Sequence, residues 1–187
     1  MTATVINLEA IANFTREKFY ALCIANPDLQ LERTNDGELI VMSPVGGESG
    51  NSEAELMTDL AIWNRQTKSG KVFSSSTIFS LPNGSDRSPD AAWVKLERWE
   101  ALTPKQQIGF PPICPDFAIE LRSATDRLKP LQAKMQEYLD NGLRLGWLID
   151  PQNQQVEIYR QNQSVEIVSM PVNLSGEDVL SEFTLNM

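Results

Sequence analysis

The alternation of hydrophobic and polar positions predicts a helix and a β-hairpin in the first part of the chain. Thr15 is a suitable N-cap for a helix that ends near Asn26-Pro27, because the residue before a proline disfavours helical geometry. Leu29, Leu31 and Arg33 alternate before Asp36-Gly37, a pair typical of tight turns, and the apolar run from Leu39 to Met42 forms the returning strand. We therefore expect an N-terminal helix and hairpin before the main sheet.

A second amphipathic helix is predicted after a glycine-rich loop at residues 43–52. Its apolar face is formed by residues spaced i, i+4 and i+7: Leu56, Leu60 and Trp63. Ser52 and Glu55 have the spacing of a capping box, which places the expected start of the helix close to Ser52. The loop lacks the GK[ST] ending of a P-loop, so no phosphate cradle of that kind is expected there.

The remaining pattern alternates strands with helices. Strand-like segments occur at residues 72–80, 90–94, 117–121, 145–149, 156–159 and 165–168. A short helix is expected within 96–107, and a longer one from Leu131 to Asn141 with Pro130 at its first position and Gly142 at its C-terminal cap. The core order is then helix, three strands, helix, strand. It predicts an α/β or α+β fold, a mixed sheet flanked by helices, in one domain over 1–187 with a core at about 50–150.

Composition and charge narrow the class of protein. The chain has 187 residues, 41% hydrophobic and 22% charged, as expected for a soluble globular domain. It has no apolar run of membrane-spanning length and no apparent secretory signal, which favours a cytoplasmic protein without membrane contact. The net charge of -9 argues against broad electrostatic binding of nucleic acid, although it allows a local basic cleft or a bound metal ion.

The chain contains no histidine, and this restricts its chemistry. Catalysis by Ser-His or Cys-His pairs and zinc held by histidine are excluded. The groups that remain are carboxylates, Lys, Arg, Tyr and the backbone. A hard, oxygen-binding ion such as Mg²⁺ or Mn²⁺ suits that inventory best.

The segment CPDFAIELRS, residues 114–123, concentrates candidate chemistry in one predicted strand. Alternate side chains of a strand share a face, so Glu120 and Arg122, about 6.6 Å apart, are expected to face one site together. Asp116 lies about 13 Å from Glu120 along the same strand, too far for both carboxylates to reach one Mg²⁺ at about 2.1 Å. We therefore interpret Asp116 as a structural residue at the strand entry.

A partner for Glu120 is expected on a neighbouring strand, about 4.8 Å away. Asp90 follows Pro89 and opens the predicted strand at 90–94. If the strands of Asp90 and Glu120 are adjacent, their carboxylates can converge on one metal ion. The preceding helix could bring Glu55 to the same place.

Pro89-Asp90 followed by Glu120-Leu121-Arg122 resembles the PD-(D/E)xK nuclease superfamily, whose core has the same order of elements. The chain more closely resembles a large bacterial group of restriction-endonuclease-like proteins whose function is largely uncharacterised. That likeness covers about residues 29–180 and runs through VMSPVGGESGN, SPDAAWVKLERW, CPDFAIELRSATDRLK, KMQEYLDNG and LGWLIDP.

The resemblance implies a role for each matching residue. Asp90 and Glu120 match the metal-binding acids, the Leu121 carbonyl is a third ligand, and Glu55 matches an acid of the first core helix. Arg122 stands where the motif usually has lysine; arginine stays protonated, so it can stabilise charge but is a poor general base. Related nucleases carry the lysine on the following helix, where Lys134 lies. The likeness also implies a nucleic-acid substrate, DNA in preference to RNA, and a homodimer.

The leading hypothesis is therefore a Mg²⁺- or Mn²⁺-dependent nuclease that hydrolyses phosphodiester bonds. Two alternatives stay open. A catalytically degenerate nuclease fold that serves as a binding or assembly module would account for Arg122 and the acidic charge. A carboxylate-pair hydrolase acting on a glycan would use the same acids without a metal.

Overall fold

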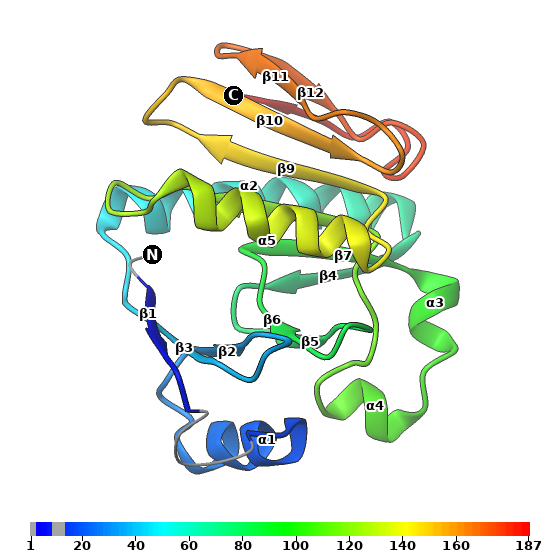
Figure 1. Ribbon diagram of the computed structural model, residues 1–187. Helices are drawn as coiled ribbons and strands as arrows, with labels where there is room; N and C mark the ends of the chain where they lie inside the picture. The colour runs from blue at the N-terminus through cyan, green and yellow to red at the C-terminus, as the bar shows by residue number, and fades with distance from the viewer. Residues whose placement is uncertain (1–2, 9–13) are drawn as a thin grey trace.

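The computed structural model describes residues 3–8 and 14–187, and its centre is a six-stranded mixed sheet with the order β11-β10-β9-β8-β7-β4 (Figure 1). Its strands are β4 (Gly70–Ser74), β7 (Ala91–Lys95), β8 (Phe117–Leu121), β9 (Leu145–Asp150), β10 (Gln155–Arg160) and β11 (Glu166–Ser169). Only the β8–β9 pair is parallel among the described pairs of this sheet. The expected fold class, a mixed sheet flanked by helices, is confirmed.

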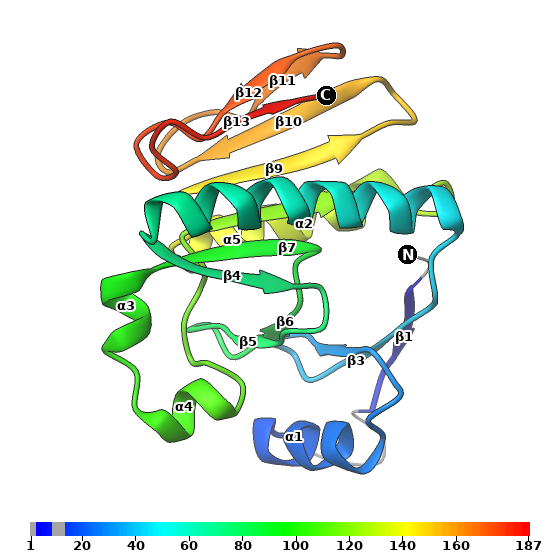
Figure 2. The same ribbon diagram turned by 180° about the vertical axis from the view of Figure 1, so that it is seen from behind.

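Two long helices lie on opposite faces of this sheet, α2 (Gly47–Thr67) and α5 (Leu128–Asp140). Figures 1 and 2, related by a half-turn, show α5 in front in one view and α2 in front in the other. The apolar stripe of α2 packs on the sheet together with the hairpin of β12 (Asn173–Ser175) and β13 (Thr184–Asn186). Met135 and Tyr138 of α5 are buried in the core on the other face.

A second sheet of five strands, ordered β1-β3-β2-β6-β5, lies below the first in Figure 1. Its strands are β1 (Ala3–Ile6), β2 (Leu31–Arg33), β3 (Leu39–Met42), β5 (Phe79–Ser80) and β6 (Asp86–Arg87). Helix α1 (Arg16–Ala25) packs against it through Phe19, and two short helices, α3 (Leu96–Glu100) and α4 (Pro104–Ile108), connect β7 to β8. The expected N-terminal helix and hairpin are present, but the hairpin is part of this larger sheet.

Three predicted boundaries differ from the structure. Helix α2 begins at Gly47, within the expected glycine-rich loop. Its N-cap is Gly46, which has no side chain to form a capping hydrogen bond. Helix α5 begins at Leu128, so that Pro130 is its third residue. The N–H groups of the first turn have no partner within a helix, so a proline at this position costs no hydrogen bond. The predicted strand at 72–80 divides into β4 and β5, which belong to different sheets.

The alternation predicted for 117–121 is confirmed and determines which way the polar residues face. Phe117, Ile119 and Leu121 are buried in the core with α2. Glu120 therefore faces the α5 side of the sheet. On that side Gly146 of β9 allows α5 to pack closely, since a Cβ added there would lie 2.4 Å from the Met135 side chain.

None of the helices within the described ranges is both long and apolar enough to cross a bilayer.

Candidate functional site

Asp90 and Glu120 lie opposite each other where β7 begins. The antiparallel register pairs Ala91 with Ile119, which sets Asp90 opposite Glu120 on the neighbouring strand. The Leu121 backbone N–H donates a hydrogen bond of 2.7 Å to Asp90 Oδ2, and this bond orients the Asp90 carboxylate beside β8. The strands of the two acids are thus adjacent, as predicted from the sequence.

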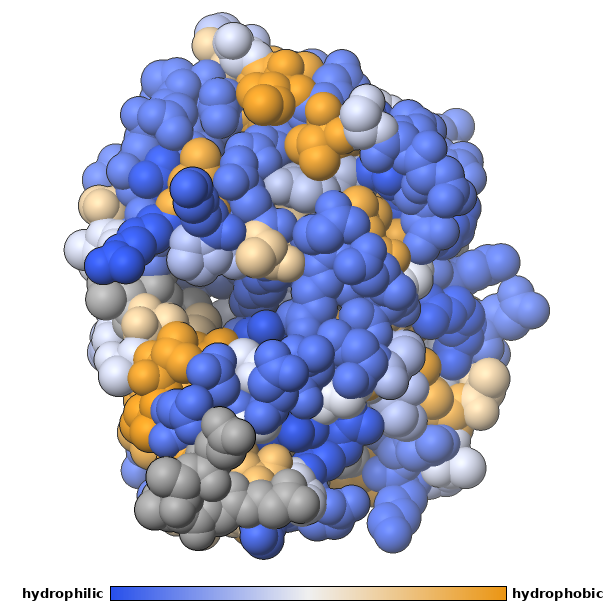
Figure 3. All heavy atoms as spheres, in the orientation of Figure 1, coloured by the Kyte–Doolittle hydropathy of each residue, from blue (hydrophilic) through white to orange (hydrophobic). Residues whose placement is uncertain are grey.

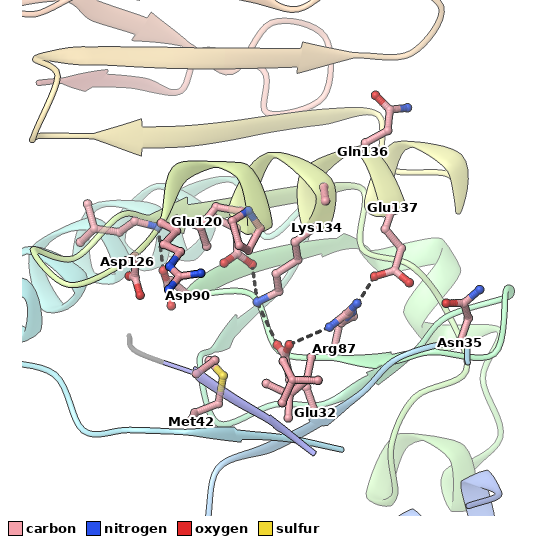
Figure 4. Close-up of a pocket in the computed structure, with 18 of the residues that line it drawn as sticks. Glu32, Asn35, Met42, Arg87, Asp90, Glu120, Asp126, Lys134, Gln136 and Glu137 are labelled. Carbon is pink, nitrogen blue, oxygen red and sulfur yellow. Dashed lines mark hydrogen bonds and ion pairs between the residues drawn. The ribbon is translucent and has the colours of Figure 1, made fainter. Parts of the chain in front are cut away.

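Lys134 of α5 reaches into the same place from above the sheet (Figure 4). Its Nζ lies 2.8 Å from Glu120 Oε1 and 2.8 Å from Glu32 Oε1, and it donates to the Ser88 carbonyl at 3.0 Å. The residue is only 8% exposed, so its charge depends on these partners. A lysine from helix α5 therefore joins the acids of β7 and β8.

An alternating chain of charges continues from Glu32 across the gap between the two sheets. Glu32 lies 3.1 Å from Arg87, and Arg87 lies 2.5 Å from Glu137 on α5. Figure 4 shows the side chains following one another in that order from Lys134. Tyr138 adds a hydrogen bond of 3.2 Å from its hydroxyl to Glu120 Oε1.

Burial and the neighbouring charges shift the protonation of this cluster. Burial, reinforced by Asp90 and Glu32 and opposed by Lys134, raises the pKa of Glu120 to about 8. Burial also raises the pKa of Asp90, against the effect of Lys134 and the Leu121 N–H. For Lys134, burial is outweighed by Glu120 and Glu32, so its pKa lies above the ordinary value and the ammonium stays charged. Lys134 is thus a fixed positive charge and not a base.

Of the two acids of helix α2, Glu53 and not Glu55 is influenced by the charge of Asp90. Glu55 is exposed and accepts a hydrogen bond of 3.2 Å from Asn51 on the same helix. Glu53 is half-buried, and burial followed by the charges of Asp90 and Asp126 raises its pKa to about 7. Two residues along a helix correspond to about 200°, so these two glutamates point to opposite sides.

The structure corrects the expected position of Arg122. Its guanidinium donates to both carboxylate oxygens of Asp150, at 3.0 and 3.1 Å, and to the Asp126 carbonyl at 3.1 Å. Strand β8 ends at Leu121, so strand alternation no longer fixes the direction of the next residue. The side chain that pairs with Glu120 is Lys134.

Asp116 lies away from Asp90 and Glu120 and has a structural role. Its carboxylate accepts a hydrogen bond of 2.8 Å from the Lys95 backbone N–H and pairs with Arg98 at 2.9 Å. It connects the entry of β8 to the end of β7 and the start of α3.

Three charged residues of this cluster and its surroundings were not predicted from the sequence: Glu32, Glu53 and Arg87. Glu32 lies on β2 of the second sheet, 55 residues before its partner Arg87, and no short motif links the two. The one signal in the sequence that could have indicated Glu32 is its charge, a carboxylate among the alternating apolar residues of the predicted hairpin. Glu53 was hidden because the helix was expected to begin at Ser52, which made Glu53 part of a cap.

The donor atoms suit a hard divalent ion held by two carboxylates. Among residues 3–8 and 14–187, no three Asp, Glu or Cys side chains are grouped as a metal cage. Mg²⁺ is commonly bound by one or two carboxylates, with water and substrate phosphate completing its shell. Asp90 and Glu120 are two such acids, and their raised pKa values reflect burial that disfavours the ionised forms, a penalty that a bound cation would offset. The residues present therefore fit Mg²⁺ or Mn²⁺.

The cluster forms the inner wall of a pocket of about 960 Å³ between the two sheets. Helix α5, the start of β7 and the end of β8 supply the polar wall. Strands β1 and β3 supply an opposite wall that includes Val5, Ile40 and Met42. Figure 3 shows hydrophobic residues gathered near the five-stranded sheet, beside the hydrophilic surface of α5.

Comparison with known families decides the relationship of this chain. The model of the Uma2 family, described as "putative restriction endonuclease", matches residues 16–187. The chain belongs to the Uma2 family. Its restriction-endonuclease-like resemblance is thereby confirmed over most of its length, and the described pocket lies almost wholly within the matched region.

A solved structure shares the fold of this Uma2 protein. It is the crystal structure of "a putative nuclease belonging to DUF820" from Anabaena variabilis, similar with a TM-score of 0.71 over 83% of this chain and 86% of that chain. The identity is 21%, so the likeness concerns the fold alone. No match was found among curated proteins.

Proposed function

We propose that this Uma2 protein is a divalent-metal-dependent nuclease that hydrolyses phosphodiester bonds in nucleic acid. The observation that supports it best is the meeting of Asp90, Glu120 and Lys134, from two adjacent strands and the following helix. Two acids and one fixed cation are the groups that a metal-assisted attack on phosphorus requires. Family membership and the shared fold support the same class of chemistry.

The metal would be held by Asp90 and Glu120, with the Leu121 carbonyl as a further ligand. Bound there, Mg²⁺ or Mn²⁺ would supply an activated water and neutralise phosphate charge. Lys134 would stabilise the negative charge that develops on the phosphate oxygens, since its ammonium stays protonated. Tyr138 would orient Glu120 through its hydrogen bond.

Two expected contributors change roles in this proposal. The supporting acid of the first core helix is Glu53, because it is half-buried and its pKa is raised by burial and by the charge of Asp90, while Glu55 is exposed. Arg122 acts as a positioning residue that fixes the end of β8 through Asp150. DNA rather than RNA as substrate, a homodimer and a cytoplasmic location stay predictions from the sequence.

The test is cleavage of labelled DNA and RNA by purified protein in Mn²⁺, Mg²⁺ or EDTA, alongside Glu120→Gln and Asp90→Asn. The exposed acid Glu97, 80% accessible at its side chain, supplies the matched control Glu97→Gln. We expect metal-dependent cleavage that falls by at least about 100-fold in the site variants, the usual scale for a lost catalytic group, and not in the control. Absence of cleavage, or full activity of Glu120→Gln, would overturn the proposal.

A binding or assembly module is the second candidate. It is favoured by the net charge of -9 and by the closed ion pairs of Lys134, which already satisfy Glu120 and Glu32. Calorimetric titration with Mn²⁺ separates the two candidates. A nuclease binds the ion in a way that Asp90→Asn and Glu120→Gln abolish, whereas a module gives no heat that depends on these acids.

A further inference from the structure

The proposed reactive groups lie at the base of the pocket and not on the surface of the protein. Glu120 is 2% exposed, Lys134 8% and Asp90 9%. Across from them stand β1 and β3, whose residues Val5 and Met42 line the same pocket. A phosphate must therefore pass between the two sheets to reach Asp90 and Glu120.

The two walls of the pocket differ in character, and the difference matches the two parts of a nucleotide. The α5 side carries Lys134 and Glu137, and these pair with Glu32 and Arg87 at the β2–β6 end of the second sheet. The opposite side presents Ala3, Val5, Ile40 and Met42, with Leu131 and Pro130 at one edge. An unpaired base offers a flat apolar face, whereas a paired base keeps that face within the stack. The apolar wall thus suits an unpaired base, one that is not stacked within a nucleic-acid duplex.

The charge of the pocket also disfavours a long, regular polyanion. Its lining includes six acids and three cations: Glu32, Asp90, Glu120, Asp126, Glu137 and Asp140, against Arg87, Arg127 and Lys134. Two of the cations, Arg87 and Lys134, are already held in ion pairs. A duplex carries one negative charge for about every 1.7 Å of its axis and is stiff over about 150 base pairs. It can neither bend into the pocket nor find a basic surface there.

We infer that the pocket takes an unpaired nucleotide, from a single strand, a frayed end or a loop, and that a blunt duplex is not its ligand. The inference deepens the proposed nuclease function and rests on it for the fate of the phosphate. Arg127 borders the pocket, is exposed, and forms no ion pair within the described chain, so it is the cation available to a phosphate that approaches from solvent.

The first test compares the binding of single-stranded and double-stranded oligonucleotides of the same sequence. Phosphorothioate oligonucleotides of one sequence, labelled with a fluorophore, are titrated with protein in Ca²⁺ as a single strand, a blunt duplex and a duplex with a single-stranded tail. We expect the single strand and the tailed duplex to bind at least about ten-fold more tightly than the blunt duplex, a difference of about 1.4 kcal/mol. Equal binding, tighter binding of the blunt duplex, or no binding of any strand overturns the inference.

Cleavage of the unmodified strands in Mn²⁺ keeps the two ideas distinguishable. A protein that binds the single strand selectively but cuts nothing loses the proposed nuclease function and keeps the ligand class. A protein that cuts blunt duplex as fast as single strand keeps the nuclease function and loses the ligand class.

A pocket variant identifies where the strand binds. Met42→Trp narrows the apolar wall, and Ile167→Trp on β11, 60% exposed and outside the pocket, is its matched control. We expect Met42→Trp to alter single-strand affinity by at least about five-fold, because an added indole either stacks on the base or excludes it, and Ile167→Trp to leave it unchanged. If both variants bind as the wild type does, with native melting temperatures, the strand does not enter this pocket.

Discussion

Lys134 Nζ lies 2.8 Å from Glu120 Oε1, and this buried ion pair joins helix α5 to the central strand β8. The same ammonium lies 2.8 Å from Glu32 of the second sheet. One side chain thus connects three elements that are distant in sequence. Since every partner is buried, the contact links the packing of the two sheets to the charge of the site.

The first prediction concerns Lys134. Lys134→Met keeps the apolar stem but leaves Glu120 and Glu32 buried without their cation. We expect the free energy of unfolding to fall by about 3–5 kcal/mol, the usual cost of breaking a buried pair, and nuclease activity to fall by at least about 100-fold. Urea denaturation and cleavage assays measure the two effects. Lys134→Arg, which retains the charge, is expected to recover stability more than activity; a Met variant as stable as the wild type would contradict the role of the pair.

The second prediction concerns pH. In the unfolded chain Glu120 ionises near its ordinary pKa of 4.5, and in the folded protein near 8. Between these values the folded state keeps a proton that the unfolded state has lost, so this group makes stability fall as pH rises from about 5 to 8. Glu120→Gln has no such proton to lose. We expect its free energy of unfolding, measured by urea denaturation in EDTA, to decline less than that of the wild type over this interval.

The expected difference is at least about 1.4 kcal/mol, which corresponds to one pKa unit. Glu53, whose pKa is also raised, is present in both proteins and largely cancels in the comparison. If the stability of the wild type and of Glu120→Gln changes in parallel from pH 5 to 8, the prediction is wrong. Glu120 would then be ionised throughout this range, the state that its ion pair with Lys134 favours.

Much of the central sheet was predictable because its signals are local. The alternation at 117–121 determined which residues face α2, and a Pro-Asp pair at the start of the preceding strand indicated the partner of Glu120. Both depend on neighbours in one strand or one strand pair. The prediction that Asp116 is structural followed in the same way, from the rise per residue along a strand.

The remaining parts of the site depend on contacts between distant elements. Glu32 reaches Lys134 only because the second sheet packs below α5, and no periodicity in the hairpin expresses that packing. Arg122 was expected beside Glu120 because alternation was extended one residue past the end of β8. Asp150, fully buried on the neighbouring strand, attracts its guanidinium instead.

The third prediction separates the two acids of helix α2. Glu53→Ala removes a half-buried carboxylate whose pKa is raised by burial and by the charge of Asp90, and Glu55→Ala removes an exposed one on the same helix. We expect Mn²⁺ affinity, measured by calorimetry, to fall in Glu53→Ala by about ten-fold or more, as for other partners of metal ligands, and to stay constant in Glu55→Ala. The opposite ranking would restore Glu55 to the site and remove Glu53.

The fourth prediction concerns Arg122, which stands at the motif position but pairs with Asp150. Asp150 is fully buried, so Arg122→Ala leaves a carboxylate with only Asn153 beside it. We expect the free energy of unfolding to fall by about 3 kcal/mol, as for other broken buried pairs, while the activity per folded molecule falls by less than about ten-fold. Arg122→Lys retains a charge near Asp150 and is expected to recover most of the stability. Single-turnover cleavage at a temperature where all variants are folded makes the comparison. If Arg122→Ala is as stable as the wild type yet as inactive as Glu120→Gln, the arginine acts on the substrate and not on Asp150.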